Sequence, residues 1–151
     1  REYPGYLYMI DNGATTTWEH WNGERSRIHN CYNGIGSWFY QAVGGIRLDG
    51  DEPAFRKILL DPQVPEGVTS AETWKETPYG KVFLKWQIRK GNKMSMEMEV
   101  PVGIEAWAVI PAGVTTYVSD GKKETSGGSE PFSVRIPAGK HKLSYSLPEQ
   151  L

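Results

Sequence analysis

One cysteine, Cys31, is present among the 151 residues. A single thiol cannot form a disulfide within the chain and cannot supply a multi-cysteine zinc site, although it leaves the redox compartment open. We interpret Cys31 as a small buried apolar side chain rather than as a nucleophile. We expect neither a metal ion nor a cofactor.

Long hydrophobic runs and clusters of positive charge are also absent. A membrane-spanning helix needs roughly 20 apolar residues, and no stretch of this sequence approaches that length. No charged segment followed by an apolar run marks a signal peptide. The net charge of −1, without a cluster of Lys and Arg, excludes the electrostatic footprint of a nucleic-acid-binding protein. With 38% hydrophobic and 23% charged residues, the chain is expected to be globular, with no membrane and no nucleic acid as partner.

The composition changes near residue 48. Residues 1–48 hold nine of the 18 aromatic side chains, interleaved with Asp, Asn, Glu and His, and this mixture is typical of a ligand site. Beyond this point, short alternating runs are separated by turn residues, and the segment 49–53 (DGDEP) is the expected boundary. We therefore predict two domains, residues 1–48 and 49–151. Because the chain opens at Arg1 without a methionine, we interpret it as a piece of a larger protein. A processed N-terminus would have the same appearance.

The first of these domains contains one clear helical signal. Apolar residues recur at helical spacing from Ile35 to Ile46, and Gly44-Gly45 provides a stop, so an amphipathic helix is predicted over about 35–45. The stretch 8–21 has no clean period. Within it, Asn12-Gly13 indicates a turn that leads into an extended or irregular segment.

The second domain has the alternating pattern of β-strands. Val82, Leu84, Trp86 and Ile88 share one face of a strand, Gly91-Asn92 marks a turn, and a methionine stripe over 94–100 forms the returning strand with its apolar face in the core. Further strands are predicted near 55–60, 70–76, 104–110, 114–118, 122–125, 131–136 and 140–146. About eight short strands without helices between them predict an antiparallel β-sandwich. Trp74, Trp86 and Trp107 lie in strand-like contexts and are expected in its core.

Candidate chemistry is confined to the aromatic part. Glu19 lies between Trp18 and Trp21, and a carboxylate flanked by indoles suits sugar hydrolysis, because aromatic faces stack on a pyranose while the carboxylate acts on water or on the anomeric carbon. A salt-bridged structural glutamate has the same local sequence. His29 is either a donor to a sugar hydroxyl or a buried histidine with a protein partner.

Three blocks of the sequence carry a family resemblance. Residues 8–24 read YMIDNGATTTWEHWNGE, which resembles the late catalytic-domain motif of bacterial α-L-rhamnosidases, Tyr-Met-Ile-Glu/Asp-Asn-Gly-Ala-Thr-Thr-x-Trp-Glu-x-Trp-x-Gly. Residues 26–29 (SRIH) and 36–40 (GSWFY) resemble the Ser-x-Asn-His and Gly-x-Trp-x-Tyr blocks of that family. Residues 42–62 are similar to the stretch that joins its catalytic and C-terminal β domains. The resemblance is strong to about residue 90 and looser beyond.

The resemblance implies an inverting glycoside hydrolase on an (α/α)6 barrel, acting on rhamnose-containing glycosides or polysaccharides. Residues 1–48 would be the last portion of that barrel, with an irregular segment and one or two helices, and residues 49–151 the C-terminal β-sandwich domain. By the same resemblance Glu19 is the general base, His29 contacts the rhamnose, and Trp18 and Trp21 are aromatic walls. The sequence departs from the family in two places: Ile28 replaces an asparagine and Asn33 a glycine.

Inversion also requires a second carboxylic acid, separated from the base by about 6.5–9.5 Å. In the family that acid lies in an earlier acidic motif, which this sequence does not contain. We therefore expect the chain alone to be inactive. Its aromatic segment and helix would normally pack against the N-terminal part of the same barrel, and without that part they would leave an apolar patch exposed.

Two other functions stay open at this point. The chain could be a carbohydrate-binding module without hydrolytic activity, or a purely structural β-sandwich that supports the barrel. An upstream acidic barrel motif in the coding frame would favour the enzyme. The expected location is extracellular or periplasmic, by analogy with enzymes that degrade plant polysaccharides.

Overall fold

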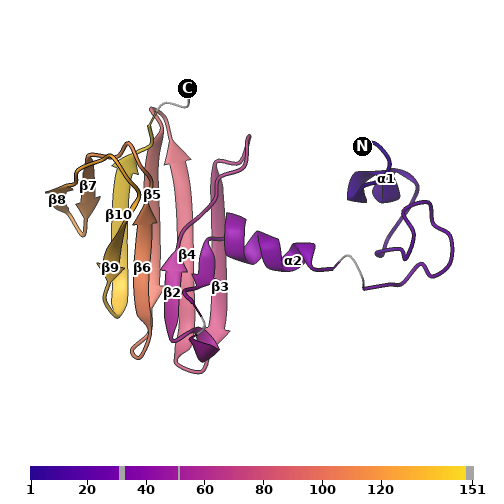
Figure 1. Cartoon of the computed structure of the whole chain (residues 1–151), viewed down its shortest axis with the longest axis horizontal. Coiled ribbons are helices and arrows are strands. Elements are labelled where there is room, and N and C mark those ends of the chain that lie inside the picture. Colours follow the sequence, from indigo (N-terminus) through magenta and orange to yellow (C-terminus); the bar gives the residue numbers. More distant parts are fainter. Residues whose placement is uncertain (31–32, 51, 149–151) are drawn as a thin grey trace. The chain divides into compact units, whose positions relative to one another are not determined.

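Contacts within the chain divide it into two units, Arg1–Trp38 and Phe39–Leu151, which we call the N-terminal unit and the sandwich unit. The computed structural model describes residues 1–30, 33–50 and 52–148 (Figure 1). Cys31, expected to be buried, lies outside the described residues. The boundary that the sequence predicts, between residues 48 and 49, stays a prediction.

The N-terminal unit is mostly irregular, with two short helices. Helix α1 (Tyr6–Asp11) was not expected, because 8–21 has no clean apolar period. It ends at Asn12-Gly13: the side-chain amide of Asn12 donates to the carbonyl of Tyr8 at 2.9 Å, and Gly13 has a φ of 84°. The predicted turn at Asn12-Gly13 is confirmed: the pair ends α1 as a C-terminal cap, and an irregular segment follows. Helix α2 (Ile35–Trp38) lies at the end of this unit.

The helix predicted over 35–45 is confirmed for residues 35–43. After α2 the chain continues as a π-helical turn, η1 (Phe39–Val43), and the N–H of Gly44 donates to the carbonyl of Phe39 at 2.7 Å. Both glycines that follow are sterically required. A side chain on Gly44 would collide with Thr73, and one on Gly45 with the backbone of Pro62. Ile46, the last apolar residue of the pattern, lies beyond the helix and begins strand β1 (Ile46–Leu48).

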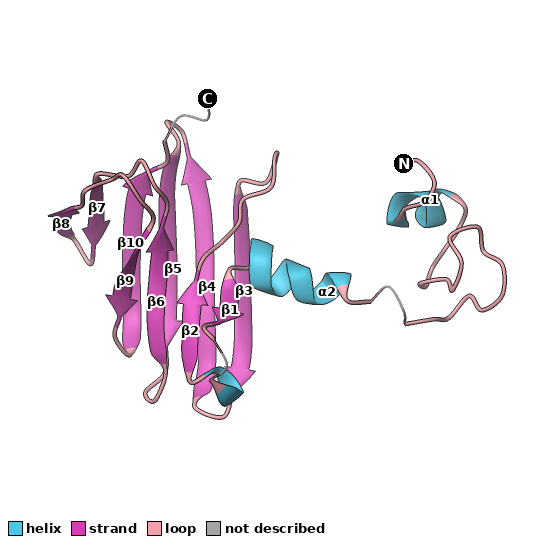
Figure 2. Ribbon diagram, viewed as in Figure 1, coloured by secondary structure: helices cyan, strands magenta, loops and turns pink. Residues whose placement is uncertain are grey.

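Two sheets build the sandwich unit, one of four strands in the order β1-β2-β6-β9 and one of six in the order β3-β4-β5-β10-β7-β8. Figure 2 shows that strands dominate this unit, beside η1 and the short 3₁₀ turn η2 (Pro53–Phe55). The strands are β1 (Ile46–Leu48), β2 (Lys57–Leu60), β3 (Ser70–Thr77), β4 (Gly80–Arg89), β5 (Lys93–Val100), β6 (Glu105–Ile110), β7 (Thr116–Ser119), β8 (Lys122–Thr125), β9 (Phe132–Ile136) and β10 (Gly139–Ser146).

The predicted β-sandwich is confirmed, with one addition to its topology. Every strand pair is antiparallel except β2 and β6, which pair in parallel with Ile58 opposite Ala106. Strand β1 had not been predicted. It pairs antiparallel with β2, with Ile46 opposite Leu60. A tight turn at Asp120-Gly121 joins β7 to β8.

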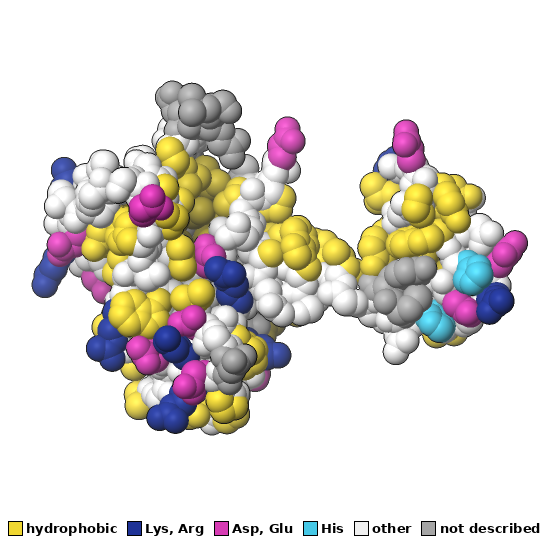
Figure 3. Space-filling model, viewed as in Figure 1, with side chains coloured by type: hydrophobic (Ala, Val, Ile, Leu, Met, Phe, Trp, Pro, Cys, Tyr) yellow, Lys and Arg dark blue, Asp and Glu magenta, His cyan; other side chains and the backbone are white. Residues whose placement is uncertain are grey.

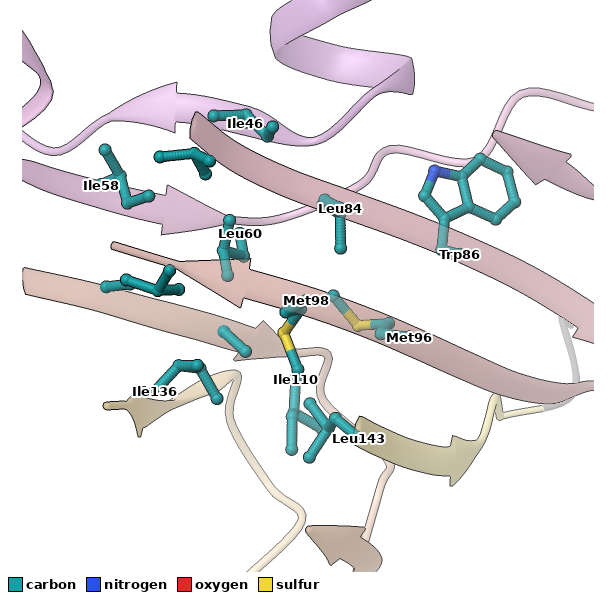
Figure 4. Close-up of a cluster of buried hydrophobic side chains, with 14 of the residues drawn as sticks. Ile46, Ile58, Leu60, Leu84, Trp86, Met96, Met98, Ile110, Ile136 and Leu143 are labelled. Atoms are coloured by element: carbon teal, nitrogen blue, oxygen red, sulfur yellow. The ribbon is translucent and has the colours of Figure 1, made fainter. Parts of the chain in front are cut away.

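The core lies between the two sheets. In β5 the side chains of Met94, Met96, Met98 and Val100 are all buried, while the residues between them face outward, so the predicted methionine core is confirmed. Figure 4 shows Met96 and Met98 beside Leu84 of β4 and Ile110 of β6. Burial of each large apolar side chain contributes roughly 1.5–3 kcal/mol.

The three tryptophans expected in this core lie in different environments. Trp86 is fully buried, and its indole N–H donates to the carbonyl of Val43 at 2.7 Å. Trp107 is half-buried. The expectation was wrong for Trp74, which is 52% exposed. Alternation along β3 explains the difference, because Thr73 is the buried residue and Trp74 therefore points to the opposite face of the sheet.

A hydrogen-bonded pair fastens the β7–β8 turn to β10. The Nδ1 of His141 donates to Oδ2 of Asp120 at 2.7 Å, and the backbone N–H of Lys142 donates to Oδ1 at 2.8 Å. These two bonds, with the histidine contribution the larger, hold the pKa of the Asp120 carboxyl below its usual value.

Asp120→Asn is expected to make the free energy of unfolding less dependent on pH in the acid range. A depressed carboxyl pKa contributes stability that is present above its unfolded pKa of about 4 and is lost as the pH falls through the folded value. Because the Asp120 side chain is 49% exposed, the effect is modest. Urea unfolding between pH 2 and 6 measures it. Equal slopes for the wild type and the variant below pH 4 would contradict this role for Asp120.

Candidate functional site

Two facing backbone segments organise the candidate site in the N-terminal unit. The N–H of Glu19 donates to the carbonyl of Ser26 at 2.8 Å, and the N–H of His29 donates to the carbonyl of Thr17 at 2.9 Å. The hydroxyls of Thr16 and Thr17 donate to the carbonyls of Arg27 and His29. Two threonines of the motif, Thr16 and Thr17, thus link the segment before Glu19 to the segment that carries His29.

Trp18 is buried, with 5% of its surface exposed. The Arg27 guanidinium lies over its ring, 5.3 Å from the centroid. A side chain at Gly23 would come within 2.9 Å of the indole. The indole therefore fills the interior of the loop that connects Glu19 to Ser26. The predicted role of Trp18 as a wall for the sugar stays a prediction.

The Glu19 side chain is 28% exposed and has two neighbours. The N–H of Ser26 donates to Oε2 at 3.3 Å, and the Arg25 guanidinium lies 3.7 Å from Oε1. A carboxylate offers about four acceptor positions, so these contacts leave room for a water molecule. The geometry suits a carboxylate that is oriented by the backbone and still reaches solvent.

Trp21 lies on the other side of the same loop. Its ring packs edge-on against Tyr6 of α1, with centroids 5.4 Å apart, and it is half-buried. Nearby, the Nδ1 of His20 lies 4.0 Å from a carboxylate oxygen of Glu24. Trp21 therefore connects the glutamate loop to α1 and keeps part of its indole accessible.

His29 lines an open hollow. Beside His29, the hollow is lined by threonine, asparagine and isoleucine residues: Thr16, Thr17, Ile28, Asn30 and Asn33. Ile28, which replaces the family's asparagine, is 82% exposed. Asn33, which replaces a glycine, has its amide oxygen 3.1 Å from the Thr17 hydroxyl.

The structure thus places Glu19 and His29 on two segments that are hydrogen-bonded to each other. The hollow beside His29 is not lined by Glu19, Trp18 or Trp21. Sequence reasoning missed Thr17, Arg25 and Ser26. The run of three threonines was a usable signal, because a hydroxyl that bonds a neighbouring backbone carbonyl is a common way to fix a loop. Among the described residues, no group of three or more His, Cys, Asp and Glu is placed to hold a metal ion, and no helix is long and apolar enough to cross a membrane.

Sequence comparison relates both parts of the chain to one family. A model described as the bacterial alpha-L-rhamnosidase C-terminal domain matches residues 45–127, more than half of the chain. The chain belongs to the bacterial alpha-L-rhamnosidase family. A second model, the 6 hairpin glycosidase domain of bacterial alpha-L-rhamnosidases, matches residues 1–43.

Two curated alpha-L-rhamnosidases match almost the whole chain. The protein from Alteromonas sp. (strain LOR) is 32% identical over 161 aligned positions, and one from Formosa agariphila is 26% identical over 160. These alignments cover 98% and 96% of the chain but only 17% of each relative. The chain therefore spans about a sixth of the length of the rhamnosidases that it matches.

Solved rhamnosidase structures share the fold. The alpha-L-rhamnosidase from Dictyoglumus thermophilum superimposes with a TM-score of 0.79 and 27% identity over 96% of the chain and 18% of that protein. The Streptomyces avermitilis enzyme, solved in complex with L-rhamnose, gives a TM-score of 0.75 and 27% identity over 95% of the chain and 15% of that protein. The predicted resemblance to α-L-rhamnosidases is confirmed by sequence and by fold.

Proposed function

We propose that this chain is the C-terminal part of an α-L-rhamnosidase that hydrolyses terminal α-L-rhamnosyl residues with inversion. The observation that carries the proposal is the carboxylate of Glu19, which is oriented by the Ser26 N–H and 28% exposed within the family's glutamate motif. Rhamnose-containing glycosides or polysaccharides are the proposed substrates. The relatives' names and the L-rhamnose complex of the Streptomyces enzyme support this choice.

Glu19 is the proposed general base. In an inverting hydrolase the base removes a proton from water as the water attacks the anomeric carbon, while an acid protonates the leaving oxygen from the other side. The Ser26 N–H orients the carboxylate of Glu19, and the accessible part of the carboxylate receives the water. The acid belongs to a part of the parent enzyme outside this chain.

His29 and the two tryptophans have supporting roles in the proposal. The imidazole of His29 lines an open hollow together with Asn30, and this position suits contact with a sugar hydroxyl. Trp21 offers its half-buried indole as an aromatic wall. Trp18 forms the buried side of that wall and holds the glutamate loop in place.

The rest of the barrel is the proposed packing partner of the N-terminal unit. Four large apolar side chains of this unit are exposed in the two helices: Leu7, Ile10, Ile35 and Trp38. In Figure 3 hydrophobic side chains are conspicuous on the surface near α1. Apolar surface of this kind is typical of an interface. The sandwich unit would then support the barrel, and we place the enzyme outside the cytoplasm, in the periplasm or the medium.

The 151 residues alone are expected to show no turnover of an aryl α-L-rhamnoside. Without a positioned acid, the rate falls by a factor of roughly 10²–10⁴, and most of the sugar pocket is missing as well. Release of the chromogenic aglycone measures the activity. Turnover by the purified chain that disappears in Glu19→Ala would overthrow the assignment of the acid to another part of the enzyme.

The same assay on the full-length parent tests the function itself. We expect hydrolysis of aryl α-L-rhamnoside and at least a hundredfold lower kcat/KM on aryl β-D-glucoside and aryl α-L-fucoside at equal concentration. The isolated 151-residue chain, which is expected to be inactive, is the negative control. A preference for either of the other two glycosides would contradict the proposed substrate class.

A further inference from the structure

Trp74 and Phe83 form an aromatic platform on the outer face of the six-stranded sheet. The two residues are direct cross-strand partners on β3 and β4, and the neighbouring pair, Thr73 and Leu84, faces the core. Trp74 is 52% exposed, although an indole of this size normally contributes to stability by being buried. Alternation places Lys81 on the same face, because Val82 is buried.

Most of the remaining charges on this face are neutralised in pairs. The ammonium of Lys85 lies 2.9 Å from a carboxylate oxygen of Glu72, and that of Lys142 lies 3.4 Å from Glu97. A third pair joins Lys140 to Glu99 at 3.9 Å. The strand registers place these groups opposite one another, so the pairing follows from the sheet itself.

Lys81 is different. Its ammonium lies 5.1 Å from the ring centroid of Trp74 and 5.9 Å from that of Phe83. Its cross-strand neighbour is Glu76, yet no ion pair within 4 Å involves Lys81 in the part of the chain that the structure describes. The ammonium therefore lies over two aromatic rings and not in a close ion pair.

We propose that Trp74, Phe83 and Lys81 bind an acidic sugar chain, a uronate-containing oligosaccharide, on the sandwich unit. The C–H face of a pyranose stacks on the Trp74 indole, and the carboxylate of the same or the adjacent sugar pairs with the Lys81 ammonium. This site involves no residue of the candidate hydrolytic site and holds whether or not Glu19 is a catalytic base.

The cation over the rings explains the preference for an acidic ligand. A lysine above an exposed ring makes only a weak contact, and its flexible stem allows the ammonium to move aside. A neutral sugar that displaces it gains stacking but leaves the ammonium without a partner. An acidic sugar replaces the cation over the ring and also gives it a carboxylate, so both groups are satisfied in the complex.

Calorimetric titration of the 151-residue chain tests the proposal. The probes are tetragalacturonate and its fully methyl-esterified form, which has the same sugar rings without the charge. Trp74→Ala removes the stacking surface and Lys81→Met removes the cation. Lys142→Gln is the matched control, because it removes a lysine from the same face that already has a carboxylate partner. Thermal melts verify that every variant is folded.

The acidic tetrasaccharide is expected to bind at least tenfold more tightly than its ester. Trp74→Ala should weaken both probes by tenfold or more, and Lys81→Met should weaken only the acidic probe and so remove the difference between the two. Lys142→Gln should leave both affinities within twofold of wild type. No binding of tetragalacturonate, equal affinity for the acid and the ester, or unchanged binding in Trp74→Ala would each overturn the proposal.

Discussion

Glu19→Gln in the full-length parent is expected to lower kcat by a factor of about 10²–10⁴ while leaving KM nearly unchanged. Glutamine keeps the size of the side chain and can still accept the hydrogen bond that the Ser26 N–H donates. It cannot accept a proton from water at neutral pH. Steady-state kinetics with an aryl α-L-rhamnoside separates the two effects, because loss of the base lowers kcat whereas loss of sugar contacts raises KM.

Azide should partly rescue the smaller variant Glu19→Ala. The anion needs no base to attack the anomeric carbon. Removal of the Glu19 carboxylate in this variant leaves space for the azide. Attack from the face opposite the leaving group gives a β-configured rhamnosyl azide. His29→Ala is the matched control, because a missing contact to a sugar hydroxyl is not restored by azide. Near wild-type kcat for Glu19→Gln would leave Glu19 as a structural partner of Arg25 and Ser26.

Trp86→Ala is expected to destabilise the sandwich unit by about 3–5 kcal/mol. The indole is fully buried between the sheets, and its N–H satisfies the carbonyl of Val43, so the substitution leaves both a cavity and a carbonyl without its donor. For a chain of this length the loss corresponds to a fall in Tm of roughly 6–20 °C. Thermal unfolding followed by circular dichroism measures it.

Trp74→Ala is the matched control for Trp86→Ala. It removes the same side chain from the outer face of the neighbouring strand, where the indole is half exposed. Exposed substitutions of this kind change stability by about 0.5 kcal/mol or less. Equal losses of stability in the two variants would contradict the assignment of the core to the inner faces of the sheets.

The strands were predictable where apolar residues alternate along the sequence and the same residues are buried in the structure. Every second residue is apolar and buried over 82–86 of β4 and 94–100 of β5. A one-residue error would expose that whole set, so the sequence determines the face as well as the strand. Trp74 was assigned to the wrong face because β3 contains few apolar residues. Polar residues lie on both faces of this strand, so the sequence pattern does not indicate which face is buried. Only Thr73 of that strand is buried.

Other features depend on partners far away in the sequence. Strand β1 is three residues long and is defined by its pairing with β2, which itself pairs in parallel with β6 some 50 residues later. Local propensity contains no information on such pairing. Helix α1 was missed for a different, local reason. Its six residues, which end at the capping Asn12, are too few for an apolar period to be visible.

The candidate site was predictable as a motif but not as a geometry. The residues around Glu19 identified the carboxylate, the histidine and the two tryptophans. Burial of Trp18 under Arg27 follows from a loop closed by backbone hydrogen bonds, which the order of residues does not reveal. The same holds for the separation of the hollow at His29 from Glu19.

Proton NMR of the first-formed sugar tests the central proposal most directly. The full-length parent is mixed with an aryl α-L-rhamnoside, and the anomeric region is recorded within the first minutes, before mutarotation equilibrates the product. If Glu19 activates water in an inverting enzyme, β-L-rhamnose accumulates first and the α anomer appears later. Initial release of the α anomer, or no release of rhamnose at all, would contradict the proposal.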